Sequence, residues 1–365
     1  MYPIREVTDK ILKGSIVPAD DGTKLYTPDG LGSYKALWTR DFAYMVIQAG
    51  DLVPVEDMLG GIAYLLRDAR PDDGWIPDRV YPNRYVRYAA GDVEFPGDAN
   101  LDNGPFMVLL ADGCLTKLDS ETAGEQFLRW QNALVRGMEC LPVNENSLIC
   151  NESDPPHSPY GFTDTICKTG LLSMETLLYW NAAGKLVKWL EATGQDASCW
   201  KQKRDAIENV FAETFMDESG MLLSATRDCR QIDIWGSCYA IHIGFPLTDV
   251  QKDGIARWLI AHYDEITEAG QICHLPRGEY WQRTFVPVAP ETYQNGAFWA
   301  TPTEWFCDAV ARLNEGLARK TVEDAMDYFE TQGIFECVNK QWRKLDTYVA
   351  SAVAVYAAAK KYLHI

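Results

Sequence analysis

Residues 164–194 read DTICKTGLLSMETLLYWNAAGKLVKWLEATG, and residues 197–216 read ASCWKQKRDAIENVFAETFM. Both stretches repeat apolar side chains every three to four residues, which is the period of an α-helix with a buried face. The first stretch is long enough for two helices. Gly194 and the polar residues after it leave room only for a short turn between the stretches. Helices joined in this way pack antiparallel, so the sequence predicts a helical hairpin here.

The same helical period recurs along most of the chain. It predicts about eleven or twelve helices in total. Strand signals are sparse, and the short stretches at residues 85–95 and 283–289 are typical of loop ribbons. The other helical stretches are residues 41–52, 55–69, 104–118, 121–141, 235–245, 249–266, 301–316, 319–333 and 348–363.

Long loops rich in Gly, Pro, Asp, Asn and Trp follow alternate helices. A closed ring of helix hairpins gives this rhythm, and so does an open α-solenoid. The two arrangements differ at the chain ends, because a ring brings the last helix beside the first whereas a solenoid keeps them apart.

Length and composition are those of a globular protein. The chain has 365 residues, of which 47% are hydrophobic and 24% charged. Because no Pro- or Ser-rich linker interrupts it, we expect residues 1–365 to form a single domain. The 52 acidic and 34 basic residues give a net charge of −18. Such a chain repels phosphate backbones, which argues against nucleic-acid partners.

The sequence contains no motif for membrane insertion, secretion, zinc binding or nucleotide binding. No apolar stretch is long enough for a membrane span, and the N-terminus has no signal-peptide pattern, so we expect a cytoplasmic protein without a membrane partner. The 10 cysteines are scattered singly and are expected to be reduced and buried. The 5 histidines form no zinc motif, and no nucleotide-binding motif occurs. We therefore expect no metal and no cofactor, and the sequence does not indicate an oligomeric state.

Polar-aromatic islands lie at the helix boundaries, and each combines a carboxylate or amide with an aromatic ring. Aromatic faces stack on sugar rings, while Arg, Asp and Asn side chains bond their hydroxyls, so this combination suits a small carbohydrate. Taken singly, an Asp or Asn before a helix is usually an N-cap, and a loop Trp is usually a packing lid. The islands are residues 37–41, 72–79, 98–106, 159–170, 231–237 and 290–305, with smaller ones at 333–339 and 348–352.

The islands also carry a family resemblance. LWTRDFAYM (37–45) resembles the WTRD loop of glucoamylases, and YQNGAFWATPTEW (293–305) resembles a segment shared by trehalases, glucosidase I and mannosylglycerate hydrolases. QIDIWGSCYA (231–240) and the closing FECVN and YVASAVAVYAA segments occur in equivalent places. The ordered set spans roughly residues 35–360 and resembles the six-hairpin glycosidase clan.

The resemblance implies an all-α (α/α)6 toroid with its active site in the funnel. It also implies an inverting, exo-acting glycoside hydrolase that uses one acid and one base, with an α-linked glucoside or mannoside in a small saccharide as substrate. The Glu-Glu acid motif of glucoamylases and the additional β-domain of many relatives are missing, which leaves the substrate open.

The resemblance nominates Asp164 as the general acid, because it follows a Gly-aromatic pair and opens the next helix, with Glu152 and Asp154 as substitutes. It nominates Glu336 as the general base, with Glu279 as its rival. Independently of the family, aromatic neighbours such as Tyr160 and Phe162 would raise the pKa of the acid, and a donor such as Arg343 would keep the base ionised. The expected sugar contacts are Trp38, Arg40, Asp41, Trp75, Asp102, Asn103, Trp235, Glu279, Tyr293, Asn295 and Trp299, although Trp38 and Phe42 also fit a core role.

Three other functions stay open at this point. An unsaturated uronyl hydrolase shares the toroid and would bind its acidic sugar through arginines such as Arg40, Arg79, Arg277 and Arg283. An epimerase of the N-acylglucosamine 2-epimerase type would use His242 and His274. A non-enzymatic α-solenoid would bind protein partners and would have no paired buried carboxylates.

Overall fold

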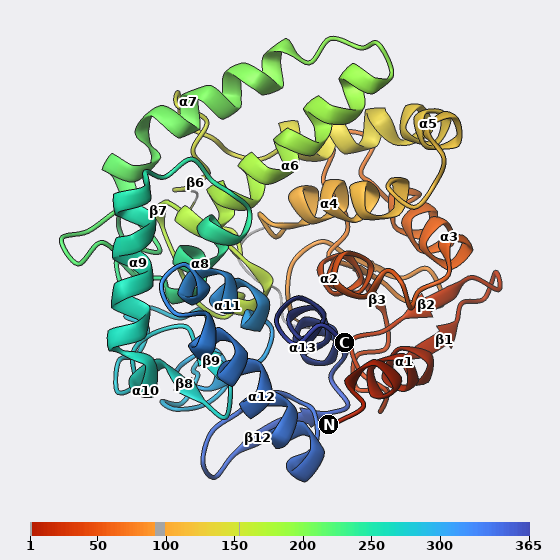
Figure 1. Cartoon of the computed structure of the whole chain (residues 1–365). Coiled ribbons are helices and arrows are strands. Elements are labelled where there is room, and N and C mark those ends of the chain that lie inside the picture. Colours follow the sequence, from red (N-terminus) through yellow and green to blue (C-terminus); the bar gives the residue numbers. More distant parts are fainter. Residues whose placement is uncertain (1, 92–98, 153) are drawn as a thin grey trace.

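The computed structural model describes residues 2–91, 99–152 and 154–365, and its long helices form two concentric rings (Figure 1). The inner ring consists of α2 (Thr39–Ala49), α4 (Asn103–Leu115), α6 (Ser173–Ala192), α8 (Ile234–His242), α11 (Thr303–Ala311) and α13 (Val349–Tyr362). The outer ring consists of α1 (Ile4–Gly14), α3 (Val55–Leu66), α5 (Ser120–Glu139), α7 (Ser198–Phe215), α9 (Asp249–Ala261) and α12 (Glu315–Gln332). A further short helix, α10, spans Tyr263–Ile266.

The inner ring is closed. Each inner helix packs against the next, from α2 through α4, α6, α8 and α11 to α13, and α13 packs against α2. The first outer helix, α1, lies against α13, so the last helix of the chain lies beside the first (Figure 1). The expected (α/α)6 toroid is therefore confirmed, and the open α-solenoid is wrong.

Helices of the inner and outer rings differ in how much of their surface is buried. Every residue of α13 from Val349 to Ala359 is buried, because neighbours surround an inner helix on all sides, and its small Ala and Val side chains permit close approach. The outer helix α5 buries one stripe, including Phe127, Trp130 and Leu134. The side chain of Asp119 accepts hydrogen bonds from two backbone N–H groups of its first turn and so fixes where α5 begins.

The lengths of the connecting loops show which way the inner helices point. Short turns lead from an inner helix to its outer partner, as at residues 50–54, 193–197 and 312–314, whereas long loops lead back inward, as at residues 15–38 and 262–302. Because each hairpin is antiparallel, all inner helices point the same way. The long loops and the N-termini of the inner helices therefore share one end of the ring.

One helix prediction needs correction. Residues 164–194 contain one long helix, α6 (Ser173–Ala192), rather than two helices. The residues before it pair instead as a strand, with Gly170 opposite Asn151 and Leu171 opposite Cys150. Gly170 has a φ of +84°, which is not helical, and a Cβ there would lie 2.5 Å from Thr226 Oγ1, so this position favours glycine.

The strands are short and line the loop end of the ring. β3 (Leu37–Trp38), β4 (Arg79–Val80) and β5 (Val86–Arg87) form one sheet, and β8 (Thr267–Glu268), β9 (Gln271–Cys273), β10 (Phe298–Trp299), β11 (Phe335–Val338) and β12 (Arg343–Asp346) form another, in the order β12-β11-β10-β9-β8. Two pairs, β1 (Ile16–Pro18) with β2 (Lys24–Tyr26) and β6 (Cys150–Asn151) with β7 (Gly170–Leu171), complete the set in the described residues.

The two predicted loop ribbons pair only briefly. In residues 85–95 the pairing is limited to β5, and residues 92–95 lie outside the described residues. In residues 283–289 the described pairing is a single bridge between Thr284 and Ile166.

All ten cysteines are free thiols, and they are buried except for Cys140 and Cys150, which are partly exposed, and Cys199, which is exposed. None of the helices in the described part of the chain is long and apolar enough to cross a membrane.

Candidate active site

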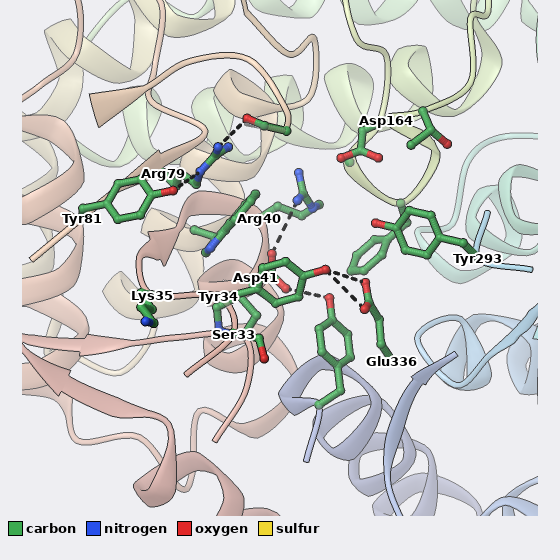
Figure 2. Close-up of a pocket in the computed structure, with 17 residues that line it drawn as sticks. Ser33, Tyr34, Lys35, Arg40, Asp41, Arg79, Tyr81, Asp164, Tyr293 and Glu336 are labelled. Carbon is green, nitrogen blue, oxygen red and sulfur yellow. Dashed lines mark hydrogen bonds and ion pairs between the residues drawn. The ribbon is translucent and has the colours of Figure 1, made fainter. Parts of the chain in front are cut away.

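A cavity of about 460 Å³ lies at the loop end of the ring (Figure 2). The first loop, the start of α2, the η1 turn and the β11 strand all contribute side chains to it. Its lining combines carboxylates, basic groups and aromatic rings, which are Pro28, Ser33, Tyr34, Lys35, Trp38, Arg40, Asp41, Arg79, Tyr81, Gly91, Gly161, Phe162, Asp164, Thr165, Tyr293, Glu336 and Tyr348.

Arg40, in the first turn of α2, is surrounded by carboxylates. Its Nη1 lies 3.5 Å from Asp78 Oδ1 and 3.5 Å from Asp102 Oδ2, and its Nη2 lies 3.6 Å from Asp41 Oδ2. A Cβ on Gly161 would lie 1.7 Å from Arg40 Nη1. The guanidinium therefore occupies space that only a glycine at position 161 leaves free.

Arg79 forms a second buried basic group beside Trp38. Its Nη1 donates to Asp78 Oδ2 at 2.7 Å, and its Nη2 donates to the carbonyl of Gly91. The guanidinium carbon lies 4.3 Å from the Trp38 ring centroid, within cation–π range. Asp78 bridges Arg79 and Arg40 from outside the cavity, so it holds the two arginines together in one polar wall.

Asp164 follows directly after the η1 turn (Gly161–Thr163). Its Oδ1 accepts a hydrogen bond from Gln294 Nε2 at 2.7 Å, and no described residue donates to its Oδ2. Burial raises the pKa of Asp164 to about 6, although Arg40 and the Gln294 amide oppose the shift. A carboxyl with this pKa holds a proton far more readily near neutral pH than an exposed aspartate does.

Glu336 on β11 is almost fully buried and has two donors. Lys344 Nζ lies 2.7 Å from Glu336 Oε2, and the Tyr34 hydroxyl donates to Oε1 at 3.1 Å. Burial raises the pKa of this carboxyl, and Lys344 opposes the rise. The donor predicted from the sequence, Arg343, is wrong: it is exposed and donates to Gln332. Side chains alternate along a strand, and the neighbouring Lys344, not Arg343, is the residue that reaches Glu336.

Tyr293 stands close to both carboxylates. In Figure 2 its hydroxyl points into the cavity between Asp164 and Glu336. Burial raises the pKa of Tyr293 well above its ordinary value, and both carboxylates add to the rise. Lys344 Nζ lies 3.6 Å from its ring centroid. Asp164 and Glu336 therefore line one cavity, each with different partners, as an acid–base pair requires.

Two tryptophans proposed as sugar contacts lie beneath the cavity instead of lining it. Trp235 and Trp299 are fully buried, and the Trp299 ring centroid lies 5.6 Å from that of Phe162, which does line the cavity. Trp235 stacks on His274 at 3.8 Å. Both rings support the cavity floor through packing.

Other proposed contacts shape the loops around the cavity. Asn103 Nδ2 donates to the carbonyls of Ile76 and Tyr88 and so ties the start of α4 to a long loop. Asn295 Nδ2 donates to the carbonyl of Val288, and Asn295 Oδ1 accepts from a backbone N–H. Neither amide lines the cavity.

Asp102 lies below Arg40 and accepts a hydrogen bond from the Gly161 N–H at 2.8 Å. Burial raises its pKa to about 7. Trp75 packs against His157, with 5.3 Å between the ring centroids, and does not line the cavity.

The alternative carboxylates lie outside the cavity. Glu279, the rival base, is exposed on a loop. Glu152 is exposed and pairs with Arg227, and Asp154 is exposed. Asp98, the first residue of the third island, lies outside the described residues. The expected helix start at Asp164 is wrong, because the next α-helix begins at Ser173.

Sequence reasoning missed several residues around the site. Tyr34 is placed by Asp29, whose carboxylate accepts hydrogen bonds from three backbone N–H groups of the turn at residues 31–34. The Tyr348 hydroxyl donates to Asp41 Oδ1 at 3.0 Å. The Gly- and Ser-rich turn was a visible signal for the first of these. Lys35, Lys344 and Tyr81 had no such signal, whereas Thr165 and Gln294 lie within two of the polar-aromatic islands.

Most of the residues that an epimerase or an unsaturated uronyl hydrolase would use lie outside the cavity. Neither His242 nor His274 lines this cavity. Arg277 pairs with Glu268, and Arg283 pairs with Asp228, both outside it. Arg40 and Arg79 do line it, but each is already paired with carboxylates. Among the described residues no group of three or more His, Cys, Asp or Glu side chains is arranged to hold a metal ion.

No protein-family model and no curated protein matches the chain. Solved structures do match it. A GH63 mannosylglycerate hydrolase from Thermus thermophilus, in complex with glucose, has a TM-score of 0.71 at 13% identity over 97% of this chain and 99% of that one. A rhamnosidase from Klebsiella oxytoca with rhamnose bound has a TM-score of 0.67 at 12% identity over 100% of this chain and 64% of that one. The chain therefore shares the fold of the six-hairpin glycosidases that its sequence motifs resemble.

Proposed function

We propose that this protein is an inverting, exo-acting glycoside hydrolase, with Asp164 as general acid and Glu336 as general base. The observation that carries the proposal is that these two carboxyls line one cavity with different partners. Asp164 has an amide partner and a pKa of about 6, whereas Glu336 has a lysine and a tyrosine as donors. Two carboxyls whose surroundings differ in this way suit the separate roles of acid and base.

In the proposed reaction Asp164 Oδ2, which is free of protein donors among the described residues, delivers a proton to the glycosidic oxygen. Glu336 takes a proton from a water molecule as the water oxygen bonds to the anomeric carbon. The bond from that carbon to the leaving oxygen breaks, and the anomer inverts. Lys344 and Tyr34 favour the ionised form of Glu336 that this step needs.

The sugar ring would be held between the polar wall and the aromatic rings. Arg40 and Asp41 lie at the cavity surface with polar atoms for the sugar hydroxyls, and Trp38 offers a face for stacking. A cavity of about 460 Å³ falls within the roughly 300–1,000 Å³ of typical small-molecule sites. This volume favours a small saccharide over a polymer, and hence release of a terminal sugar.

The proposed substrate class is an α-linked glucoside or mannoside. It is supported by the shared fold of a mannosylglycerate hydrolase, solved with glucose, and of a rhamnosidase, solved with rhamnose. A cytoplasmic location belongs to the same proposal, because ten free thiols suit a reducing compartment.

A proton-NMR time course tests this function. The wild-type protein is incubated with mannosylglycerate and with a panel of α- and β-glucosides, mannosides and rhamnosides, and the anomer released first is read from its anomeric proton. We expect an α-linked member to release the β-anomer. Asp164→Asn and Glu336→Gln should each slow the reaction by roughly 10²–10⁴-fold.

Glu279→Gln is the matched control, because this glutamate is exposed and does not line the cavity. Its rate should equal that of the wild type. Release of the retained anomer would refute the inverting mechanism. A folded Asp164→Asn protein with full activity would refute the acid assignment, and cleavage of no glycoside on the panel would refute the substrate class.

A further inference from the structure

A second cavity, of about 420 Å³, lies at the other end of the ring. It is lined by residues from the C-terminal ends of inner helices, among them Gln48 on α2, Thr116 after α4 and His242 on α8. The active-site cavity lies at the opposite end of the ring, where Arg40 and Asp41 in the first turn of α2 and Tyr348 directly before α13 line it. Phe162 of the first cavity and Tyr44 of the second are in ring contact, with 5.8 Å between their centroids, so aromatic packing separates the two spaces.

Two hydrogen-bond acceptors in the second cavity lack partners among the described residues. Gln48 is buried, and its Oε1 has no hydrogen-bond partner in the described structure. Glu304 also lines the cavity, and no described residue donates a hydrogen bond to its carboxylate. Buried polar groups in folded proteins are normally paired. Gln48 Oε1 is a buried group without a partner, and Glu304 in the same cavity is partly exposed, so together they mark a place where a ligand that donates hydrogen bonds is favoured.

Donors accompany the acceptors. His242 Nδ1 lies 2.8 Å from Asp308 Oδ2, which orients the imidazole and leaves Nε2 without a partner among the described residues. Lys117 is exposed and lines the cavity, and Lys185 lines it while lying 3.2 Å from Asp112 Oδ2. A ligand here meets both donors and acceptors.

Two aromatic side chains in tilted ring contact, at an interplanar angle of 57°, complete the lining. The ring centroids of Tyr239 and Trp305 are 4.8 Å apart, and both residues line the cavity. An aromatic face next to a carboxylate suits a sugar ring, and it also suits an organic cation. Glu304 and Asp112, which also line the cavity, balance Lys117 and Lys185 in formal charge, so the lining gives a cation no net attraction. A hydroxyl group, in contrast, donates and accepts at once, so it satisfies Gln48 and Glu304 as well as the lysines.

We propose that this cavity is a second ligand site, separate from the active site, for a small neutral polyhydroxy compound such as a monosaccharide or a polyol. The site stands on its own lining residues. It does not depend on the function proposed for the first cavity.

Direct binding measurements test the site. The full chain is titrated calorimetrically with D-mannose, D-glucose, myo-inositol and glycerol, and crystals are soaked in the same compounds. Choline chloride serves as the cationic probe. We expect at least one polyhydroxy compound to occupy the second cavity with hydrogen bonds to Gln48 and Glu304. Gln48→Leu and Glu304→Gln should each weaken binding there by roughly tenfold.

Lys117→Ala provides a variant that leaves the interior intact, because Lys117 is exposed. It should weaken the same binding event by a few fold. Lys10→Ala, which removes an exposed lysine on α1 away from both cavities, is the matched control and should change nothing. The proposal is overturned if the second cavity stays empty while the first is filled. It is also overturned if choline binds there and no polyhydroxy compound does, or if the three variants keep wild-type affinity.

Discussion

Lys344 Nζ lies 2.7 Å from Glu336 Oε2, and the two residues come from the paired strands β12 and β11. The lysine offsets part of the cost of burying an ionised carboxylate, so Glu336 loses its proton at a lower pH than burial alone would allow. Among the described residues Asp164 has no such cation within hydrogen-bonding distance and receives only the Gln294 amide. The difference between the proposed acid and base therefore depends on their partners, since both carboxyls lie in one cavity.

Replacing Lys344 with methionine should move the acidic limb of the pH–rate profile to higher pH. The base must be ionised, and loss of the cation raises the pKa of Glu336 further, so activity should disappear at a higher pH as the solution is acidified. The profile of kcat/KM against pH measures the shift. Arg343→Met removes the neighbouring cation, which faces solvent, and should leave the limb in place. Equal shifts in both variants would contradict the role of Lys344.

The alkaline limb of the same profile should follow Asp164. Since the acid must be protonated, kcat/KM should fall as the pH rises through about 6. Gln294→Met removes the hydrogen bond that favours the ionised carboxylate, so the pKa of Asp164 should rise and the limb should move to higher pH. A shift to lower pH would be inconsistent with this account. A thermal melt run alongside shows that the variant is folded.

Gly161→Ala should displace Arg40 and impair the protein. The new Cβ would lie 1.7 Å from Arg40 Nη1, and the guanidinium cannot retreat without leaving Asp78 and Asp102. We expect a loss of about 2–4 kcal/mol in the free energy of unfolding, together with a lower kcat/KM. Denaturant titration measures the stability. In the control Gly254→Ala on α9, the Cβ meets nothing within 4 Å, and stability should rise by about 0.5–1 kcal/mol. Equal stability of the two variants would show that the close approach has no energetic weight.

The ionisation of Asp102 should lower the free energy of unfolding as the pH rises from about 4 to about 7. Burial raises its pKa to about 7 in the folded state, so in this range the folded chain holds a proton that the unfolded chain has lost. Asp102→Asn cannot titrate and should show a flatter dependence of unfolding free energy on pH. Denaturant titrations at several pH values test this expectation.

Asp112→Asn is the matched control for this dependence. Burial alone would raise the pKa of Asp112, but Lys185 and Lys188 bring it below its ordinary value. Above about pH 5 this carboxyl is therefore ionised in both the folded and the unfolded chain, so between about pH 5 and 7 the variant should keep the wild-type slope. A wild-type slope in Asp102→Asn would contradict the raised pKa of Asp102.

The helical period of the sequence alone predicts most of the helices in the two rings. It failed at residues 164–172, where apolar residues continue the pattern but the backbone pairs as a strand. Gly170 permits a positive φ there, and its partner strand at residues 150–151 is distant in sequence. A local period cannot report a pairing of this kind, because the energy comes from the partner and not from the segment itself.

The candidate active site was likewise predicted in part from local motifs, while the rest of it depends on the tertiary structure. Asp164, Glu336, Arg40, Asp41, Trp38 and Tyr293 were chosen from their motifs, and all of them line the cavity. Trp235 and Trp299 belong to equally distinctive motifs but lie beneath it, because the sequence does not show which face of a loop or helix start turns inward. Lys344 was missed for the neighbouring Arg343, since a strand places adjacent side chains on opposite faces and the register was unknown.

The sequence by itself determined the helix hairpins, the chemistry of the loops and the residue types that an acid–base pair needs, because these depend on local period and composition. Only the tertiary structure decided that the ring closes, with α1 against α13. Asp164 is paired with Gln294, and Glu336 is paired with Lys344 and Tyr34. The residues that line the second cavity come from several helices, among them α2, α8 and α11. Contacts between residues so far apart in the chain exist only once the ring has formed, and burial and charge pairing act on pKa values only there.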